Sequence, residues 1–295
     1  MRMQLAIRPT HILMFVAVMA VWSFNFVVVK WAVAAFPPLF FVALRFAIVS
    51  LSLVPFVQRP RGRQWRGLFL VSLTLGVLHF ACMFNGMVLT PASTAALIQQ
   101  LQVPLAAILA AAFLGDRLGW RRIVGMALTF VGAVIILGEP DLTAPLWSQG
   151  LILAAGFFWA VSTIQIKQLK GIPAMTLNAW IALLAVPQLL FVSWLFEEGQ
   201  RAALAAIDWQ GILVVLYNSV FIVLIGYGTW YHLLKRYDVN QAMPFTLLMP
   251  PMGVLFGALF LDEPLGWTLL VGGLVTLAGV ALIVLTRPPS AVPEA

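Results

Sequence analysis

Two segments of the chain decide the fold: LGWRRIVGMALTFVG at residues 118–132 and LGWTLLVGGLVTLAG at residues 265–279. Both begin with Leu-Gly-Trp and carry two further glycines at matching places, and every matched pair is 147 positions apart. Pro104 and Pro251 are separated by the same 147 positions. Six identities at one fixed offset are not expected between unrelated apolar segments, so we interpret them as an internal repeat.

The repeat continues upstream of these segments. Trp22 is followed eight positions later by Lys30, and Trp159 is followed eight positions later by Lys167. Here the offset is 137, and the difference of ten residues fits a longer connection around residues 197–208.

The composition requires lipid as the solvent. Of the residues 62% are hydrophobic and only 9% are charged, whereas soluble domains carry roughly a quarter charged residues. Apolar runs of about 17 to 25 residues are long enough to cross a bilayer as helices. Ten such spans are expected, at residues 11–34, 38–57, 67–90, 92–114, 121–138, 149–169, 174–196, 208–234, 240–261 and 267–286.

These spans divide the chain into two halves of five, at residues 11–138 and 149–286. Because five is odd, the second half must cross the membrane in the opposite sense from the first. An inverted repeat of this kind is a recurring design among transporters. The predicted fold is an all-α membrane protein of ten transmembrane helices in two inverted five-helix repeats.

The first span has an alternative interpretation as a signal peptide, since Arg2 and Arg8 precede an apolar stretch and residues 32–34 are similar to a cleavage site. We favour a retained helix because the apolar core at residues 12–29 is longer than a usual signal core. A matching segment also recurs in the middle of the chain, where no signal would act.

Charged residues separate by the side of the membrane that the ten spans assign to them. One side holds 14 of the 17 basic residues: Arg2, Arg8, Arg59, Arg61, Arg63, Arg66, Arg117, Arg121, Arg122, Lys167, Lys170, Lys235, Arg236 and Arg287. The other side holds Glu139, Asp141, Glu197, Glu198, Asp208, Asp262 and Glu263. Basic loops mark the cytoplasm, so both termini are expected there. The separation explains the net charge of +7 without nucleic acid as a partner, and the loop at 59–63 is expected to meet anionic lipid headgroups.

Several motifs together resemble one family. They are LGDRL at residues 114–118, LDEPL at 261–265, a Trp in the first helix of each half, and the segment from Pro37-Pro38 to Leu44-Arg45-Phe46. With the repeat, they make residues 11–286 similar to the EamA-type branch of the drug/metabolite transporter superfamily. The resemblance implies helices 1–4 and 6–9 around a central cavity, with helices 5 and 10 at the periphery. It also implies export of amino acids, including aromatic ones, and related metabolites.

Polar residues inside the spans are the candidates for the substrate-binding cavity, because such residues are costly in lipid and usually face the bundle interior. Helix–helix hydrogen bonds are the alternative for each of them. The candidates are Trp22, Asn25, His79, Asn85, Gln99, Gln100, Trp159, Thr163, Asn218 and Tyr227. His79 has the alternatives of relaying a proton, binding a carboxylate or packing structurally. Asn85 is expected roughly on the same helix face as His79, and Trp230 in the interfacial aromatic belt.

Three further positions carry specific expectations. Pro104 and Pro251 break corresponding helices and are candidate hinges, with kinks for packing as the alternative. Arg45 is the one charge deep in a span. It has the chemistry to bind a substrate carboxylate, but our default expectation is a scaffold residue whose guanidinium is satisfied by backbone carbonyls.

Absent motifs narrow the function. Away from their ends the spans contain no Asp or Glu, which argues against proton/cation exchange through a membrane carboxylate and favours a neutral or zwitterionic substrate. No phosphate-binding loop for ATP and no metal-ligand spacing occur, so neither cofactor nor metal is expected, and Cys82 alone forms no intramolecular disulfide.

The sequence thus predicts a secondary transporter, and no enzyme, in the inner (cytoplasmic) membrane. It is expected to export neutral or aromatic amino acids or related small metabolites by alternating access, as a monomer or alternatively a homodimer. The alternatives are a permease for a nucleobase or drug-like compound and a non-transporting membrane protein. A membrane enzyme acting on lipid would need clustered His, Asp or Glu near one interface, which the sequence does not supply.

Overall fold

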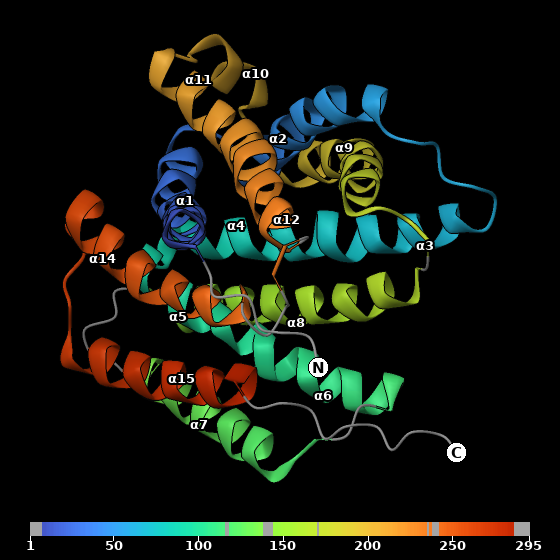
Figure 1. Cartoon of the computed structure of the whole chain (residues 1–295). Helices are drawn as coiled ribbons and strands as arrows, with labels where there is room; N and C mark the ends of the chain where they lie inside the picture. The colour runs from blue at the N-terminus through green and yellow to red at the C-terminus, as the bar shows by residue number, and fades with distance from the viewer. Residues whose placement is uncertain are drawn as a thin grey trace, which may run out of the picture.

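The computed structural model describes residues 8–115, 118–137, 144–169, 171–234, 236–237 and 242–285, and these ranges are helical with short connections (Figure 1). Several residues of the charge pattern lie outside them: Arg2, Arg117, Glu139, Asp141, Lys170, Lys235 and Arg287. Residue 138 and residues 240, 241 and 286, at the ends of three expected spans, also lie outside.

The first half contains the five expected spans. They are α1 (Pro9–Ala35); α2 (Pro38–Leu53) with η1 (Val54–Phe56); α3 (Gln64–Val71), η2 (Ser72–His79) and α4 (Phe80–Leu89); α5 (Ala92–Ile98), η3 (Gln99–Leu101) and α6 (Gln102–Leu114); and α7 (Trp120–Leu137). The bounds differ from the expected ones by three residues or fewer, except that α2 itself ends at Leu53 and continues as η1.

The second half contains the remaining expected spans and one additional short helix. They are α8 (Leu146–Gln168); α9 (Ala174–Phe196); the short α10 (Gln200–Ala205); α11 (Trp209–Leu216), η4 (Tyr217–Tyr227) and α12 (Gly228–Leu234); η5 (Met243–Leu248) and α14 (Met249–Leu261); and α15 (Trp267–Leu285). Within the described residues, nine helices are long and apolar enough to cross a membrane, and Phe245–Leu261 is a shorter apolar helix. The sequence did not predict α10.

The third and fourth spans of each half depart from regular α-helix at matching places. In the third spans, η2 and η4 are π-helical, and adding 147 to Ser72–His79 gives a range inside Tyr217–Tyr227. In the fourth spans, η3 and η5 are 3₁₀ helices that immediately precede proline-bearing first turns. Proline has no N–H to donate, so the backbone before it loses a regular α-helical hydrogen bond and tightens.

The two segments that begin with Leu-Gly-Trp, at residues 118–132 and 265–279, form one close helix pair, α7 against α15 (Figure 1). A Cβ added at Gly125 would lie 2.7 Å from the Gly279 carbonyl oxygen, and one added at Gly132 would lie 2.6 Å from that of Gly272. Gly125 and Gly132 are the repeat equivalents of Gly272 and Gly279, so the contact is reciprocal, as in a two-fold interface. Small residues allow the two backbones to approach closely in lipid.

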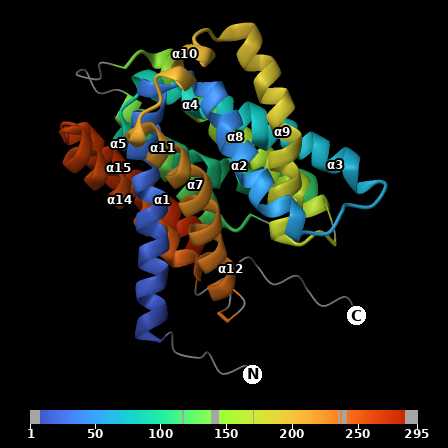
Figure 2. The same cartoon turned by 90° about the horizontal axis from the view of Figure 1, so that it is seen from above.

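The halves also meet along other helix pairs. Helix α2 packs on α9, α1 packs on η4 and α14, and α8 packs on η2 and α6. Figure 2 shows α1 beside α11 and α12 along its length. The first helix of each half therefore packs against the third and fourth spans of the other half, and these contacts position the candidate site.

Two carboxylates of the second half bind helix N-termini of the first half. The Glu197 oxygens accept the backbone N–H groups of Leu39 (2.7 Å) and Phe40 (3.0 Å) at the start of α2. The Glu263 oxygens accept those of Ala92 (2.5 Å) and Ser93 (2.8 Å) at the start of α5. Each pair satisfies donors that have no partner within the helix and places negative charge at its positive end.

We expect Gly125→Ala and Gly279→Ala each to lower the free energy of unfolding in detergent by about 1 to 3 kcal/mol, because a methyl group overpacks the α7–α15 contact. Thermal or denaturant unfolding of the purified protein measures this. Gly150→Ala in α8 is the control, since an added Cβ there meets nothing within 4 Å. Alanine is the better helix former, so that variant should be neutral or stabilised. Equal losses at all three positions would contradict the close-contact interpretation.

Candidate functional site

An aromatic cluster joins α1 to the eighth span. The Trp22 ring centroid lies 5.0 Å from that of Tyr227 and 5.5 Å from that of Trp230. Gly226 leaves room for the indole, because an added Cβ there would collide with Trp22 Nε1. That Nε1 is buried and has no hydrogen-bond partner. The cluster therefore combines broad ring faces with an unused donor.

An amide pair lies one turn along α1 from the cluster. Asn218 Nδ2 donates to Asn25 Oδ1 at 2.7 Å, across the contact between the two halves. Asn218 is fully buried, and its own Oδ1 has no partner. The expected pair of Trp22 and Asn25 on one face of α1 is thus brought together with Asn218 and Tyr227 of η4.

Arg45 is buried midway along α2, with 5% of its surface exposed. Its guanidinium carbon lies 4.6 Å from the centroid of the Phe80 ring and 5.4 Å from that of Phe46. Its Nε has no hydrogen-bond partner, and the hydrogen bonds of the described residues include none from Arg45. The expectation that backbone carbonyls satisfy the guanidinium is therefore wrong for the part of the chain that the structure describes. The Tyr227 hydroxyl and the His79 imidazole lie within electrostatic range of it.

The ring contacts do not offset the burial of this charge. A cation–π contact contributes about 0.5 to 2 kcal/mol. The effective penalty for burying an ion is several kcal/mol even after relaxation. Arg45 is thus a charge whose environment lacks a partner of matching strength.

His79 ends η2 and connects it to α8. It is 4% exposed, and its Nδ1 lies 2.8 Å from the Ala155 carbonyl oxygen. Because a carbonyl oxygen only accepts, Nδ1 carries a proton, which leaves Nε2 as the second ring nitrogen for other chemistry. The ring also meets Phe80 edge to face, at 4.7 Å between centroids. His79 and Arg45 therefore share one aromatic neighbour.

The candidates on α8 satisfy their hydroxyl groups within the helix. Thr163 Oγ1 and Ser162 Oγ both donate to the Trp159 carbonyl oxygen, at 3.0 and 2.7 Å. Trp159 itself is half-buried. Among the described residues, Trp159 and its repeat equivalent Trp22 make no direct ring contact.

Gln99 and Gln100 lie in the 3₁₀ segment η3, and Gln102 begins α6. Gln100 is buried and its Nε2 donates to the Ala96 carbonyl oxygen at 3.4 Å, whereas Gln99 is half-buried. Gln102 packs against α8, since an added Cβ on Gly156 would lie 3.5 to 3.7 Å from its atoms. Its Oε1 is buried without a partner. Proline at 104 follows directly, in the first turn of α6.

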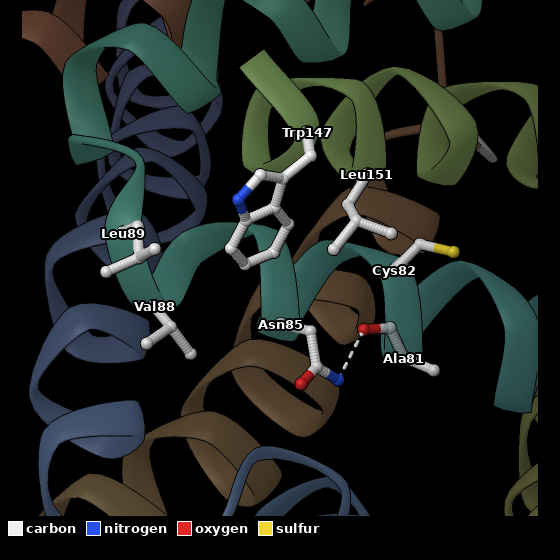
Figure 3. Close-up of a pocket in the computed structure, with 7 residues that line it drawn as sticks. All are labelled: Ala81, Cys82, Asn85, Val88, Leu89, Trp147 and Leu151. Atoms are coloured by element: carbon white, nitrogen blue, oxygen red, sulfur yellow. Dashed lines mark hydrogen bonds between the residues drawn. The ribbon is translucent and has the colours of Figure 1, made fainter. Parts of the chain in front are cut away.

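Asn85 lies apart from the other candidates. Figure 3 shows it in a mostly apolar groove of about 450 Å³ with Trp147 and Leu151 of α8, and its amide donates to the Ala81 carbonyl at 2.9 Å. The expectation that it shares a face with His79 is wrong. Six residues at 100° each place Asn85 about 120° around the helix from His79.

Sequence reasoning missed the aromatic residues that complete the site. Trp230 was expected in the interfacial belt, but it is 6% exposed and packs edge to face on Phe15, at 5.7 Å. Phe46 and Phe80 were not among the candidates for the cavity. The available signal was their position, because Phe46 follows Arg45 and Phe80 follows His79.

These features define a class of protein. A multi-pass helical bundle with a charge and unpaired polar groups at the contacts between its halves is typical of membrane transporters. The chain belongs to the EamA-like transporter family, whose sequence profile matches residues 9–138 and 146–285. This confirms the resemblance found in the sequence.

Two similar curated proteins are described as probable amino-acid metabolite efflux pumps. The one from Salmonella typhimurium is 34% identical over 272 residues, and the one from Escherichia coli is 33% identical over 273 residues. Each alignment covers 89% of this chain and 90% of the relative. A probable terminal-alkyne amino-acid exporter of Streptantibioticus cattleyicolor is 28% identical, with 90% of this chain and 93% of the relative covered. A crystal structure with 18% identity shares the fold, with a TM-score of 0.63 over 94% of this chain and 96% of that one.

We expect Asn25→Leu and Asn218→Leu to be coupled in stability, because each leaves a buried amide without its partner. A double-mutant cycle of unfolding free energies in detergent should give a coupling of about 0.6 kcal/mol, the average for such bonds in membranes, and at most about 1.7 kcal/mol. Thr74→Val is a control outside the cycle. It removes a different bond between helices, to Gln165 at 2.6 Å, and its effect should add to that of Asn25→Leu. Additive losses for the asparagine pair would show that the bond does not form.

Proposed function

We propose that this protein exports neutral amino acids, including aromatic ones, or related small metabolites across the inner (cytoplasmic) membrane. The descriptions of the relatives support the substrate class. The observation that carries the proposal is the cluster of Trp22, Tyr227 and the Asn25–Asn218 pair between the two halves. Ring faces suit an apolar side chain, and unpaired amide and indole groups suit a polar head.

The proposed mechanism is alternating access around a central cavity between two inverted repeats, residues 11–138 and 149–286. Three observations support it: the reciprocal glycine contact of α7 and α15, the π-helical segments in both third spans, and the 3₁₀ segments in both fourth spans. The charge pattern supports cytoplasmic termini. In this mechanism the halves rock against each other, which opens the cavity to one side at a time.

This orientation assigns roles to groups at both ends of the bundle. It places Glu197 and Glu263 outside, where their bonds to the starts of α2 and α5 tie the halves together. It places His11 and Tyr237 inside, where His11 Nδ1 and the Tyr237 hydroxyl lie 2.6 Å apart. Alternating access requires the Glu197 and Glu263 bonds to break while the His11–Tyr237 contact is kept when the cavity opens outward. When the cavity opens inward, the His11–Tyr237 contact must break while the two glutamate bonds are kept.

Counterflow in liposomes tests the function. We expect the reconstituted protein to exchange labelled leucine and phenylalanine, and to discriminate against nucleobases and a lipophilic cation. Trp22→Ala and His79→Ala should each slow this exchange at least tenfold, because they remove a ring face and the bridge between η2 and α8. Initial rates at equal protein content are the measurement.

Trp194→Ala in α9 is the matched control for the tryptophan variant, because this side chain is 73% exposed and should be dispensable. Exchange of only the cation would overturn the substrate class. Unchanged amino-acid exchange in Trp22→Ala and His79→Ala would place the site elsewhere.

The hinge interpretation concerns Pro104 and Pro251. The double replacement by Ala restores one backbone donor in each fourth span. We expect η3 to become regular helix, η5 to change less because Pro244 and Pro250 remain, and exchange to slow severalfold. Substrate affinity should change little, since neither proline belongs to the cluster. Pro187→Ala is the control, because Pro187 lies inside α9 and outside these 3₁₀ segments. Wild-type exchange rates in the double variant would exclude a hinge role.

A further inference from the structure

We infer that Arg45 binds the carboxylate of the transported substrate. The inference rests on the proposed function and deepens it, since it states which part of an amino acid the protein recognises by charge. Arg45 is a cation at mid-span, 5% exposed, whose Nε has no hydrogen-bond partner. A buried cation of this kind requires an anion, and the chain does not provide one within the described residues.

The carboxylates of the described residues lie at helix ends, away from Arg45. Glu197 and Glu263 are bound by backbone N–H groups, and Asp208 accepts the Gly211 N–H at the start of α11. Asp262 and Glu198 occupy the connections that follow α14 and α9. Among the described residues no carboxylate is available to Arg45, and we infer that the substrate brings the anion.

The surroundings of Arg45 fit a carboxylate. The Phe80 ring lies 4.6 Å from the guanidinium carbon and the Phe46 ring 5.4 Å, so the two rings restrict the guanidinium and leave its N–H groups unused. A planar guanidinium matches a carboxylate through two parallel hydrogen bonds. One buried positive charge balances one negative charge, which favours a carboxylate over a phosphate dianion.

The location of Arg45 connects it with the candidate site. Tyr227 lies within electrostatic range of the guanidinium and also packs on Trp22. The His79 ring contacts Phe80, the same ring that lies 4.6 Å from the guanidinium carbon. A carboxylate on Arg45 would thus lie among side chains of both halves. The apolar part of the same substrate would reach the Trp22 and Tyr227 rings.

Lys30 is a cation of the same chain whose hydrogen bonds are satisfied by the protein itself. Its Nζ donates to the carbonyl oxygens of Met87, Val88 and Thr90, at 2.9, 3.2 and 3.2 Å. These carbonyls lie at the end of α4, where a helix favours positive charge. Lys30 is fully engaged by the fold, whereas Arg45 is not.

Ligand-induced thermal stabilisation of the purified protein is the test. The probes are phenylalanine, 3-phenylpropionate (carboxylate without ammonium) and phenethylamine (ammonium without carboxylate). We expect both carboxylates to raise the Tm of the wild type more than the amine does. Arg45→Met should weaken apparent carboxylate affinity at least tenfold and leave the amine unchanged. Without ligand its Tm should equal or exceed that of the wild type, because an unpaired buried charge has been removed.

Two further variants keep the test decisive. Arg45→Lys retains the charge but loses the planar fork, so it should fold and bind carboxylates severalfold more weakly. Lys30→Met should lower the Tm and preserve the preference for carboxylates. An unchanged carboxylate preference in Arg45→Met or Arg45→Lys would overturn the inference, as would a preference lost equally in Lys30→Met.

Counterflow of labelled phenylalanine separates this inference from the proposed function. Absence of exchange by the wild type would overturn the proposed function. The thermal shifts with 3-phenylpropionate would still decide whether Arg45 binds carboxylates. Exchange by the wild type together with equal exchange by Arg45→Met would retain the function and overturn the role of Arg45.

Discussion

The close contact between α7 and α15 is the constraint on which the arrangement of the halves depends. In lipid, apolar side chains gain little by leaving their surroundings, so helices associate through close packing and hydrogen bonds. Gly125 and Gly132 supply such packing against Gly279 and Gly272, where the backbone of one helix lies against carbonyl oxygens of the other. The contact is reciprocal, and α1 and α8 each pack against the third span of the opposite half.

Much of this fold follows from the sequence because the bilayer limits the choice of structures. Every backbone group must be satisfied within its own segment, so an apolar run such as residues 174–196 has only one outcome, the helix Ala174–Phe196. The prolines also predicted where the fourth spans depart from the α-helix. The π-helical turns of η2 and η4 were not predictable in this way. No residue type in Ser72–His79 requires them, and α8 and α1 pack against these segments in the structure.

The candidate site was predictable only in part, since helix faces do not specify which neighbour they meet. Trp22 and Asn25 share a face of α1, and the structure places them on Tyr227 and Asn218 as expected for polar groups at one interface. Asn85 belongs to a different groove. Arg45 shows that a sequence does not predict the surroundings of a buried side chain. Its depth was evident from the sequence, but whether carbonyls or aromatic rings surround a guanidinium depends on tertiary packing.

The positions of the acidic groups explain why Arg45 has no anionic partner among the described residues. Glu197 and Glu263 satisfy the N-termini of α2 and α5, so they contribute to the contact between the halves and have no free oxygen pair for a distant cation. A carboxylate built into the spans beside Arg45 would neutralise it permanently and would make the site indifferent to an anionic ligand. Leaving the guanidinium with ring faces alone keeps its electrostatic requirement open. In the proposed mechanism, a substrate that brings its own carboxylate would stabilise the closed bundle relative to the same bundle without substrate. This difference would couple binding to a change of conformation.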